Sequence, residues 1–364
     1  MTKKRVFVLT HFPSPYHVEL FNAVAQCDQI SLAVVYLYSN FANRSWVLPE
    51  FSHEHLLLDD EPRRLGQVER WMERADLAIF NYYRHRDVQR LINQRAVSRR
   101  AWCFWGERPG FNRLGPLGAF YRRWKLSALH RSDAPVWGMG RWAVEKYREE
   151  MGGNRAYFNV PYFSDLRRFK RSNNGRGSAE GSRTFLYSGS LIHRKGVDLL
   201  AEAFSHLAAK SPEVELKIVG DGDLRATMES KLSPWEDRVR FVGFKDWTEL
   251  PSFYQSSDVL CVPSRYDGWN LAVPEGLAAG LPVIGTDRVG AAIELIRHRE
   301  NGWLIPADDA DALYEAMDEA ATLPRESLNK RSRAAETSVA NYDTSAGVDR
   351  FHQAVHGTLR AYAI

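Results

Sequence analysis

Short runs of apolar residues alternate along this chain with longer segments in which apolar residues recur every three or four positions. The short runs contain Val, Ile, Leu and Phe with little polar interruption, which is typical of parallel strands buried on both faces. We therefore predict strands at 5–10, 31–38, 76–82, 101–105, 134–138 and 157–160, and again at 184–188, 214–219, 239–242, 259–262, 282–285 and 302–305.

The longer segments have the period of amphipathic helices and fall between the predicted strands. They predict helices at 16–25, 66–74, 88–95, 116–130 and 141–150 in the first half, and at 197–209, 224–231, 247–255, 271–279, 291–297 and 310–321 in the second. Two last helices, at 327–339 and 345–362, follow without strands between them. Regular alternation of strand and helix indicates doubly wound parallel sheets.

The alternation is interrupted once, between Lys170 and Arg183, where no large apolar residue occurs. Such a stretch buries no surface, so we expect an exposed, mobile linker at 171–183. We predict a first domain at 1–170 and a second domain at 184–344, with a C-terminal helix near 345–364 packing back on the first domain. The predicted fold class is α/β, with two Rossmann-like domains facing each other across a cleft that binds the ligands.

Composition limits the possible functions. A chain of 364 residues exceeds the usual size of one core, which also favours two domains. The net charge of +4 is far below that of a general nucleic-acid binder. The three cysteines form no Cys-x-x-Cys pair, so we expect reduced thiols in a cytoplasmic protein and neither a zinc site nor a disulfide framework. No apolar run is long enough to span a membrane or to act as a signal peptide.

Candidate chemistry concentrates in residues 263–286, PSRYDGWNLAVPEGLAAGLPVIGT. A strand is predicted to end at Val262, and a helix to begin near Asn270 as its N-cap. The free amide groups of 268–272 would then form a site for a pyrophosphate. Asp267 and Glu275 flank this helix start and can accept hydrogen bonds from sugar hydroxyls. A capping aspartate and an exposed helical glutamate explain the same two residues without any function.

This segment resembles the E-x7-E region of retaining glycosyltransferase family 4, whose fold is called GT-B. Further matches follow in the expected order along the second half: Gly189-Ser190-Leu191, Lys195-Gly196-Val197-Asp198, Ile218 to Gly222 and Val242-Gly243-Phe244. The first half resembles the family much less.

The resemblance implies roles for individual residues. Lys195 would neutralise the donor pyrophosphate, Glu275 would hold ribose hydroxyls, and Asp267, where the family usually has Glu, would contact the donor sugar. Arg194 can supply the charge of an arginine that the family has where Ser190 stands here, or it can simply face solvent. The donor site would be completed by Gly189 in the phosphate loop, by backbone amides of Gly268, Trp269, Asn270 and Leu271, and by Gly243, Phe244 and Lys245 beside the base.

In the first half, Glu107 follows a predicted strand at a position where many family members have a histidine facing the reacting sugar. Glu107 can accept the proton of the acceptor hydroxyl, or it can simply pair with Arg108 or another surface cation. His11, Ser14 and Tyr16 lie in the first predicted strand-to-helix connection, and we assign them to the acceptor side.

Charge explains the predicted mechanism. Breaking a sugar–phosphate bond leaves a diphosphate anion, which Lys195, Arg194 and helix amide groups would stabilise without a metal. We predict a retaining, metal-independent hexosyltransferase without a cofactor, which uses a UDP- or GDP-sugar and a glycan or lipid-linked acceptor in cell-surface polysaccharide synthesis. Two alternatives stay open: a nucleotide-sugar epimerase or hydrolase, and a non-catalytic sugar-nucleotide binding protein.

A last feature is the stretch from Arg108 to Arg131, in which six basic residues occur without Asp or Glu. Aromatic residues lie among them, and Leu114, Leu117 and Trp124 follow helical spacing. A basic, aromatic helix can lie on an anionic membrane, which would place the cytoplasmic enzyme on the inner face of the cell membrane. Alternatively, these apolar residues are core and the cations are merely solvated.

Overall fold

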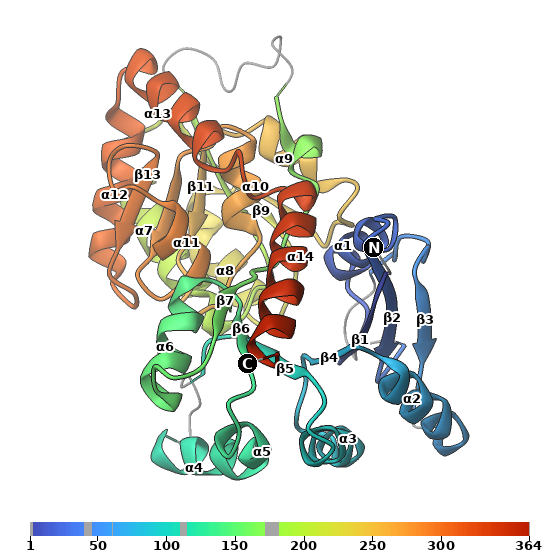
Figure 1. Ribbon diagram of the computed structural model, residues 1–364. Helices are drawn as coiled ribbons and strands as arrows, with labels where there is room; N and C mark the ends of the chain where they lie inside the picture. The colour runs from blue at the N-terminus through green and yellow to red at the C-terminus, as the bar shows by residue number, and fades with distance from the viewer. Residues whose placement is uncertain (1–2, 40–45, 60, 110–114, 172–181, 364) are drawn as a thin grey trace. The chain divides into compact units, whose positions relative to one another are not determined.

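The computed structural model describes residues 3–39, 46–59, 61–109, 115–171 and 182–363 (Figure 1). The chain divides into two compact units. Unit 1 consists of Met1–Ser164 and Thr344–Ile364, and unit 2 consists of Asp165–Asp343. Each unit contains one fully parallel sheet with helices on its faces. The prediction of two doubly wound α/β domains is therefore confirmed.

The sheet of unit 1 has the strand order β3-β2-β1-β4-β5-β6-β7. Because the chain starts in the middle and moves outward in both directions, the order reverses between β1 and β4, where α/β sheets usually bind ligands. Side chains of β1 alternate between two apolar clusters: Phe7 and Leu9 belong to one face, Val6 and Val8 to the other. The strands are β1 (Lys4–Thr10), β2 (Ile30–Tyr36), β3 (Glu54–Leu57), β4 (Leu77–Phe80), β5 (Trp102–Gly106), β6 (Val136–Gly138) and β7 (Tyr157–Asn159).

Helices cover both faces of this sheet, and one of them comes from the far end of the chain. Helix α14 packs against α1, and its buried Phe351 contacts the rings of Trp105 and Trp137. The Trp137 Nε1 group also donates to Thr358 Oγ1 at 2.9 Å. The helices of unit 1 are α1 (Pro15–Ala25), α2 (Pro62–Arg74), α3 (Arg86–Val97), α4 (Gly115–Lys125), α5 (Ser127–His130), α6 (Arg141–Met151) and α14 (Thr344–Ala361).

The sheet of unit 2 has the order β10-β9-β8-β11-β12-β13 and reverses at β8, which pairs with both β9 and β11. Its strands are β8 (Arg183–Ser188), β9 (Val214–Val219), β10 (Val239–Gly243), β11 (Val259–Val262), β12 (Val283–Thr286) and β13 (Gly302–Ile305). Its α-helices are α7 (Val197–Lys210), α8 (Arg225–Leu232), α9 (Leu250–Gln255), α10 (Ala272–Ala278), α11 (Gly290–Leu295), α12 (Ala310–Thr322) and α13 (Arg325–Ser338), with short 3-10 turns η1 (Leu166–Phe169), η2 (His193–Lys195) and η3 (Ser233–Trp235).

Three local predictions need correction. Strand β3 was not predicted, because this edge strand, EHLL, has a single buried residue, Leu56, and lacks the apolar signature of the inner strands. The helix predicted at 116–130 is broken at Leu126, whose backbone is not helical, into α4 and α5. The N-cap of α10 is Leu271 and not Asn270.

The division between the units falls at Ser164, earlier than the predicted boundary at 170. The turn η1 packs on α9 and α10, and the Phe169 ring meets Tyr254 edge to face at 5.0 Å. These contacts tie η1 to unit 2. Most of the predicted linker at 171–183 lies outside the described residues. Within the described ranges, no helix has both the length and the apolar character needed to cross a bilayer.

Candidate functional site

The predicted donor residues lie where the central strands of unit 2 end. Strands β8 and β11 are parallel neighbours, with Phe185 opposite Val259 and Leu186 opposite Leu260. The loop that follows β8 and the loop that follows β11 therefore leave the same edge of the sheet side by side. The first loop carries Lys195 and the second carries Asp267.

Lys195, Arg194 and Asp267 converge at this edge. The Lys195 Nζ atom lies 2.5 Å from Asp267 Oδ2, and Arg194 Nη1 lies 3.3 Å from the same oxygen. The side chains of Lys195 and Asp267 are only 14% and 16% exposed. Burial acts to raise the pKa of Asp267, but the charges of Lys195 and Arg194 outweigh it and hold that pKa below its ordinary value. Two cations are thus paired with one partly buried carboxylate.

A glycine permits this close approach of the two loops. Gly196 is the N-cap of α7 and has a φ of +67°, in the left-handed region that favours glycine. A Cβ atom at Gly196 would lie 2.0 Å from the Pro263 carbonyl oxygen, in the loop after β11. Any other residue there would push the Lys195 turn away from the Asp267 loop.

The loop from Asp267 to α10 has an unusual backbone at Asn270, whose φ is +79°. The Asn270 Oδ1 atom accepts from the Ala272 amide at 3.2 Å, so this side chain still serves the helix start although Leu271 is the N-cap. Among the described residues, no backbone carbonyl accepts a hydrogen bond from the amides of 268–271. The Trp269 side chain is buried and stacks on Tyr342, so only the backbone of Trp269 is available to contact a ligand.

Glu275 lies on α10, within hydrogen-bond distance of a residue that the sequence did not single out. The Tyr254 hydroxyl donates to Glu275 Oε2 at 3.3 Å. Burial, and then the Glu275 carboxylate, raise the pKa of Tyr254 well above its usual value, so the phenol stays protonated and keeps donating. Nothing in the spacing of α9 distinguishes Tyr254 from an ordinary core tyrosine.

The residues predicted to border the base, Gly243, Phe244 and Lys245, lie at the end of β10, next to the end of β9. The Gly243 carbonyl accepts from the Gly220 amide at 2.8 Å, and the Gly189 amide donates to the Val219 carbonyl at 2.9 Å. Phe244 is 49% exposed. Lys245 pairs with Glu249 at 3.1 Å, so its charge is partly used within the protein.

An Asp-x-Asp spacing, a common metal-binding pattern, occurs at Asp221 and Asp223 after β9. The Asp221 carboxylate accepts from the Gly222 amide at 2.8 Å and from Arg225 Nη1 at 3.3 Å. In the part of the chain that the structure describes, no three His, Cys, Asp or Glu side chains gather as they would around a metal ion.

In unit 1, Glu107 follows β5 and meets Tyr162, a second residue that the sequence did not single out. The Tyr162 hydroxyl donates to Glu107 Oε1 at 2.9 Å, and the Tyr147 hydroxyl donates to the Glu107 carbonyl at 2.9 Å. The Arg108 guanidinium lies 3.9 Å from the centre of the Trp142 ring. The Tyr16 ring lies 4.9 Å from that of Tyr162. The structure thus brings Glu107 and Tyr16 together through Tyr162.

The other two acceptor-side candidates differ in accessibility. The His11 ring stacks on Tyr82, with ring centres 4.2 Å apart and planes within 5°. Burial, and then the charges of Arg84 and His85, lower the pKa of His11. Ser14 is fully buried before α1, and within the described residues its hydroxyl has no hydrogen-bond partner. His11 therefore remains a candidate for ligand contact, whereas Ser14 is placed to support the loop.

Comparison with known proteins connects this geometry to a family. Residues 169–338, nearly all of unit 2, match the family described as glycosyl transferases group 1. AmsK of Erwinia amylovora, an amylovoran biosynthesis glycosyltransferase, is 34% identical over 131 residues, covering 34% of this chain and 32% of the relative. LpsB of Rhizobium meliloti, a lipopolysaccharide core biosynthesis mannosyltransferase, is 29% identical over 238 residues, covering 58% of this chain and 62% of the relative. The chain thus spans less than two thirds of the length of these relatives.

A solved structure matches the whole chain. The Anabaena protein HepE in complex with UDP and glucose has a TM-score of 0.76 at 16% identity, covering 97% of this chain and 100% of its own. At this identity the likeness concerns the fold. The chain has the GT-B fold, and its unit 2 carries the sequence pattern of the group 1 glycosyl transferases.

Proposed function

We propose that this protein transfers a hexose from a nucleoside-diphosphate sugar to a glycan or lipid-linked acceptor in cell-surface polysaccharide synthesis. The observation that carries the proposal is the convergence of Lys195, Arg194 and Asp267 at one sheet edge, within the segment that matches the family. The roles of AmsK in amylovoran biosynthesis and of LpsB in lipopolysaccharide core biosynthesis support the acceptor class.

The chemistry follows from the charges at this edge. As the sugar–phosphate bond breaks, negative charge develops on the departing diphosphate. Lys195 and Arg194 stabilise that charge, and they are held in place before the donor arrives. Asp267 neutralises them in the absence of donor. When a diphosphate takes over this neutralisation, the carboxylate of Asp267 turns to hydroxyls of the donor sugar.

Other donor contacts belong to the same proposal. Glu275, oriented by Tyr254, accepts hydrogen bonds from ribose hydroxyls, and the exposed Phe244 ring stacks on the base. Amides of 268–271 bind the sugar and the phosphate. HepE binds UDP in its solved complex, which favours a UDP-sugar donor and keeps a GDP-sugar as the second candidate. The E-x7-E resemblance supports family 4 and retention of the anomeric configuration.

We propose that the reaction needs neither a metal nor a cofactor, because Lys195 and Arg194 supply the positive charge that a metal would otherwise provide. Asp221 already caps its own turn and pairs with Arg225. Turnover that persists in excess EDTA would support this proposal, and turnover that requires added Mg²⁺ or Mn²⁺ would contradict it.

On the acceptor side, Glu107 accepts the proton of the attacking hydroxyl, and Tyr162 orients its carboxylate. His11 and Tyr16 contact the acceptor. We place the enzyme in the cytoplasm, where its three free cysteines would stay reduced, with α4 in contact with the anionic inner face of the cell membrane.

A ligand panel followed by product analysis tests the proposed function. Binding to the native state raises the melting temperature, so UDP- and GDP-sugars are compared with the free sugars. The stabilising nucleotide sugar is then incubated with and without glycan or lipid-linked acceptors. Transfer only in the presence of acceptor supports the proposal. Acceptor-independent release or isomerisation favours the hydrolase or epimerase alternative, and binding without turnover favours the non-catalytic one.

A further inference from the structure

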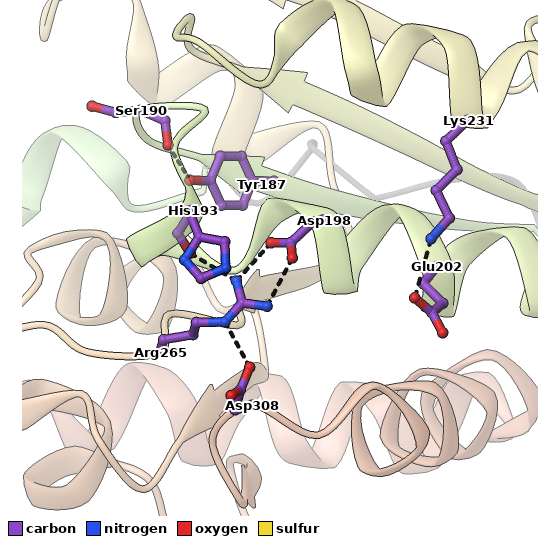
Figure 2. A network of polar contacts seen from close by, with 8 residues as sticks. All are labelled: Tyr187, Ser190, His193, Asp198, Glu202, Lys231, Arg265 and Asp308. Carbon is purple, nitrogen blue, oxygen red and sulfur yellow. Dashed lines mark hydrogen bonds and ion pairs between the residues drawn. The ribbon is translucent and has the colours of Figure 1, made fainter.

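Arg265, two residues before Asp267, joins three loops of unit 2 (Figure 2). Its Nη1 and Nη2 atoms each lie 2.7 Å from an oxygen of Asp198, in the first turn of α7. Its Nε atom donates to Asp308 Oδ1 at 2.6 Å, in the loop after β13. Nη1 also donates to the His193 carbonyl at 2.8 Å. One guanidinium therefore holds the turn after β8 and the loop after β13 to the loop after β11.

The two carboxylates around Arg265 argue against a direct contact between its guanidinium and the diphosphate. Its side chain is 17% exposed and faces two carboxylates, so the cluster carries a net negative charge. Hydrogen bonding to Asp198 raises the pKa of Arg265. Partial burial opposes ionisation of Asp198, but the hydrogen bonds and charge of Arg265 hold the pKa of Asp198 below its usual value. The guanidinium is thus already committed to groups of the protein.

The segment that Arg265 binds through hydrogen bonds contains Lys195. Its two contacts in the turn, the His193 carbonyl and the Asp198 carboxylate, lie on either side of Lys195 in the sequence. The Arg265 amide also donates to the Arg194 carbonyl at 2.9 Å, and Arg194 Nη1 donates to the Tyr266 carbonyl at 2.9 Å. The three-residue turn η2 is too short to fix its own position, so these cross-loop contacts determine where Lys195 points.

We propose that Arg265 is a positioning residue that holds Lys195 at the Asp267 carboxylate and, given the proposed function, at the donor diphosphate. The role requires arginine. A planar guanidinium binds both carboxylate oxygens of Asp198 and still reaches Asp308 and His193, whereas a single ammonium group cannot span these positions. If Arg265 had no positioning role, its ion pairs would act as ordinary surface salt bridges. They would contribute little to stability and would not affect the position of Lys195.

The first test needs no nucleotide. Lysine amines of the folded protein are briefly acetylated with a trace of acetic anhydride, and the extent at Lys195 is measured by mass spectrometry against all other lysines. We expect Lys195 to react slowly in the wild type because it is buried and paired. In Arg265→Lys and Arg265→Gln its relative reactivity should rise several-fold.

A matched control lies on the same helix. Glu202 of α7 pairs with Lys231 of α8 at 3.1 Å, and both side chains are more than 40% exposed (Figure 2). Glu202→Gln breaks this pair and should leave the reactivity of Lys195 unchanged. Unchanged reactivity in both Arg265 variants would overturn the proposal. If an Arg265 variant unfolds, Asp198→Asn, which keeps the shape of the side chain, replaces it in the acetylation test. Loss of the fold in Arg265→Lys and Asp198→Asn alike would make Arg265 a residue of general stability and also overturn it.

The second test uses turnover and rests on the proposed function. Displacing a charged group by about 1 Å can cost on the order of a hundredfold in rate, so Arg265→Lys should lower kcat/KM for the donor by about tenfold to a hundredfold. In a Lys195→Ala background the same substitution should cost much less, because the residue that it positions is gone. Penalties that simply multiply would contradict the proposal. If the wild type uses no nucleotide sugar, the proposed function fails, while the acetylation result still decides the role of Arg265.

Discussion

Lys195 and Asp267 are 72 positions apart in the chain, yet their charged atoms lie 2.5 Å apart. Both side chains are largely shielded from water, so each charge depends on the other. Removing one member of such a pair leaves the other buried and uncompensated, which costs more than the pair itself contributes. Arg194 moderates this cost, because it lies 3.3 Å from the same Asp267 oxygen and can still neutralise it.

We expect Lys195→Ala to fold and to lose most of its turnover. Losing one group that stabilises transition-state charge commonly costs about 2.7–4 kcal/mol of barrier. The measurement is kcat and kcat/KM with the donor identified by the binding panel, together with a melting curve. Lys231→Ala removes an exposed lysine from the same unit and should behave as the wild type. Wild-type kinetics in a folded Lys195→Ala protein would rule out its role at the phosphate.

The histidines of unit 1 make its stability depend on pH. His17 is packed among aromatic rings, and burial lowers its pKa from 6.5 to about 3. The folded state therefore keeps His17 neutral at pH values at which the unfolded chain binds a proton. Well above pH 6.5 His17 is neutral in both states, and its ionisation does not affect stability. As the pH falls from 6.5 towards 3, the unfolded chain binds the proton and the unfolding free energy falls by at most about 1.4 kcal/mol for each pH unit.

Replacing this histidine tests the linkage. Between pH 7 and pH 5 the wild type should lose about 2 kcal/mol of unfolding free energy through His17 alone. In His17→Leu that part of the loss should be absent when urea unfolding of unit 1 is followed at the two pH values. The buried His53, whose pKa is lowered to about 4, leaves a loss of nearly the same size in place. The exposed His356 provides the control, since His356→Gln should keep the full pH dependence.

At the scale of elements, α4 differs from the other helices of unit 1 in what it exposes. Leu117, Phe120 and Trp124 are 73%, 73% and 62% exposed, which contradicts the alternative in which Leu117 and Trp124 are core residues. Lys125 lies 4.8 Å from the centre of the Trp124 ring, and the helix contains no acidic residue. Arg122, in contrast, pairs with Glu150 at 2.8 Å and is mostly buried. Residues 110–114 of this stretch, Leu114 included, lie outside the described residues.

The exposed apolar residues of α4 make the prediction of membrane contact more specific. The protein should sediment with anionic vesicles at low salt and much less with neutral ones, since each cation near such a surface contributes about 1 kcal/mol. Arg123→Glu with Lys125→Glu should abolish this binding, and Trp124→Ala should weaken it. Lys330→Glu with Arg333→Glu makes the same change of charge on the exposed side of α13 and should bind vesicles as the wild type does. Equal, negligible sedimentation of the wild type with both kinds of vesicle would contradict the prediction.

At the scale of the whole molecule, unit 1 is built from both ends of the chain. Helix α14 closes one face of its sheet after the chain has completed unit 2. Phe351 is fully buried against Phe21, Trp105 and Trp137. Unit 1 therefore completes its core only when the last helix has been synthesised, whereas the residues of unit 2 are contiguous.

Truncating one side chain of α14 should therefore destabilise one unit and spare the other. A large-to-small change at a buried phenylalanine costs about 3–5 kcal/mol, so Phe351→Ala should lower the stability of unit 1 by that amount. Hydrogen exchange read by mass spectrometry should show faster opening of β1, β5 and β6 and unchanged protection of β8, β9 and β11. Arg360→Ala, on the exposed side of the same helix, should change neither unit. Equal loss of protection in both units would show that they unfold together.

The sequence alone determined every described strand except β3, and most helices, because a parallel strand buried on both faces must be a continuous apolar run and a helix must repeat its apolar face. It also singled out Lys195, Asp267 and Glu275, since each lies in a short contiguous motif, Lys195 in 195–198 and the two carboxylates in 263–286. The edge strand β3 and the break at Leu126 escaped prediction because they leave almost no trace in the apolar pattern.

Only the tertiary structure decided which side chains meet. The order of strands in unit 2 places β8 beside β11, and that order brings Lys195 to Asp267 and Arg265 to Asp198. Tyr254 and Tyr162, which orient Glu275 and Glu107, lie 21 and 55 positions from these partners and look like ordinary core tyrosines in the sequence. The apolar residues of α4 likewise have helical spacing, and only packing shows that they face outward. Periodicity records which face of an element is apolar, whereas partners depend on how the chain brings those elements together.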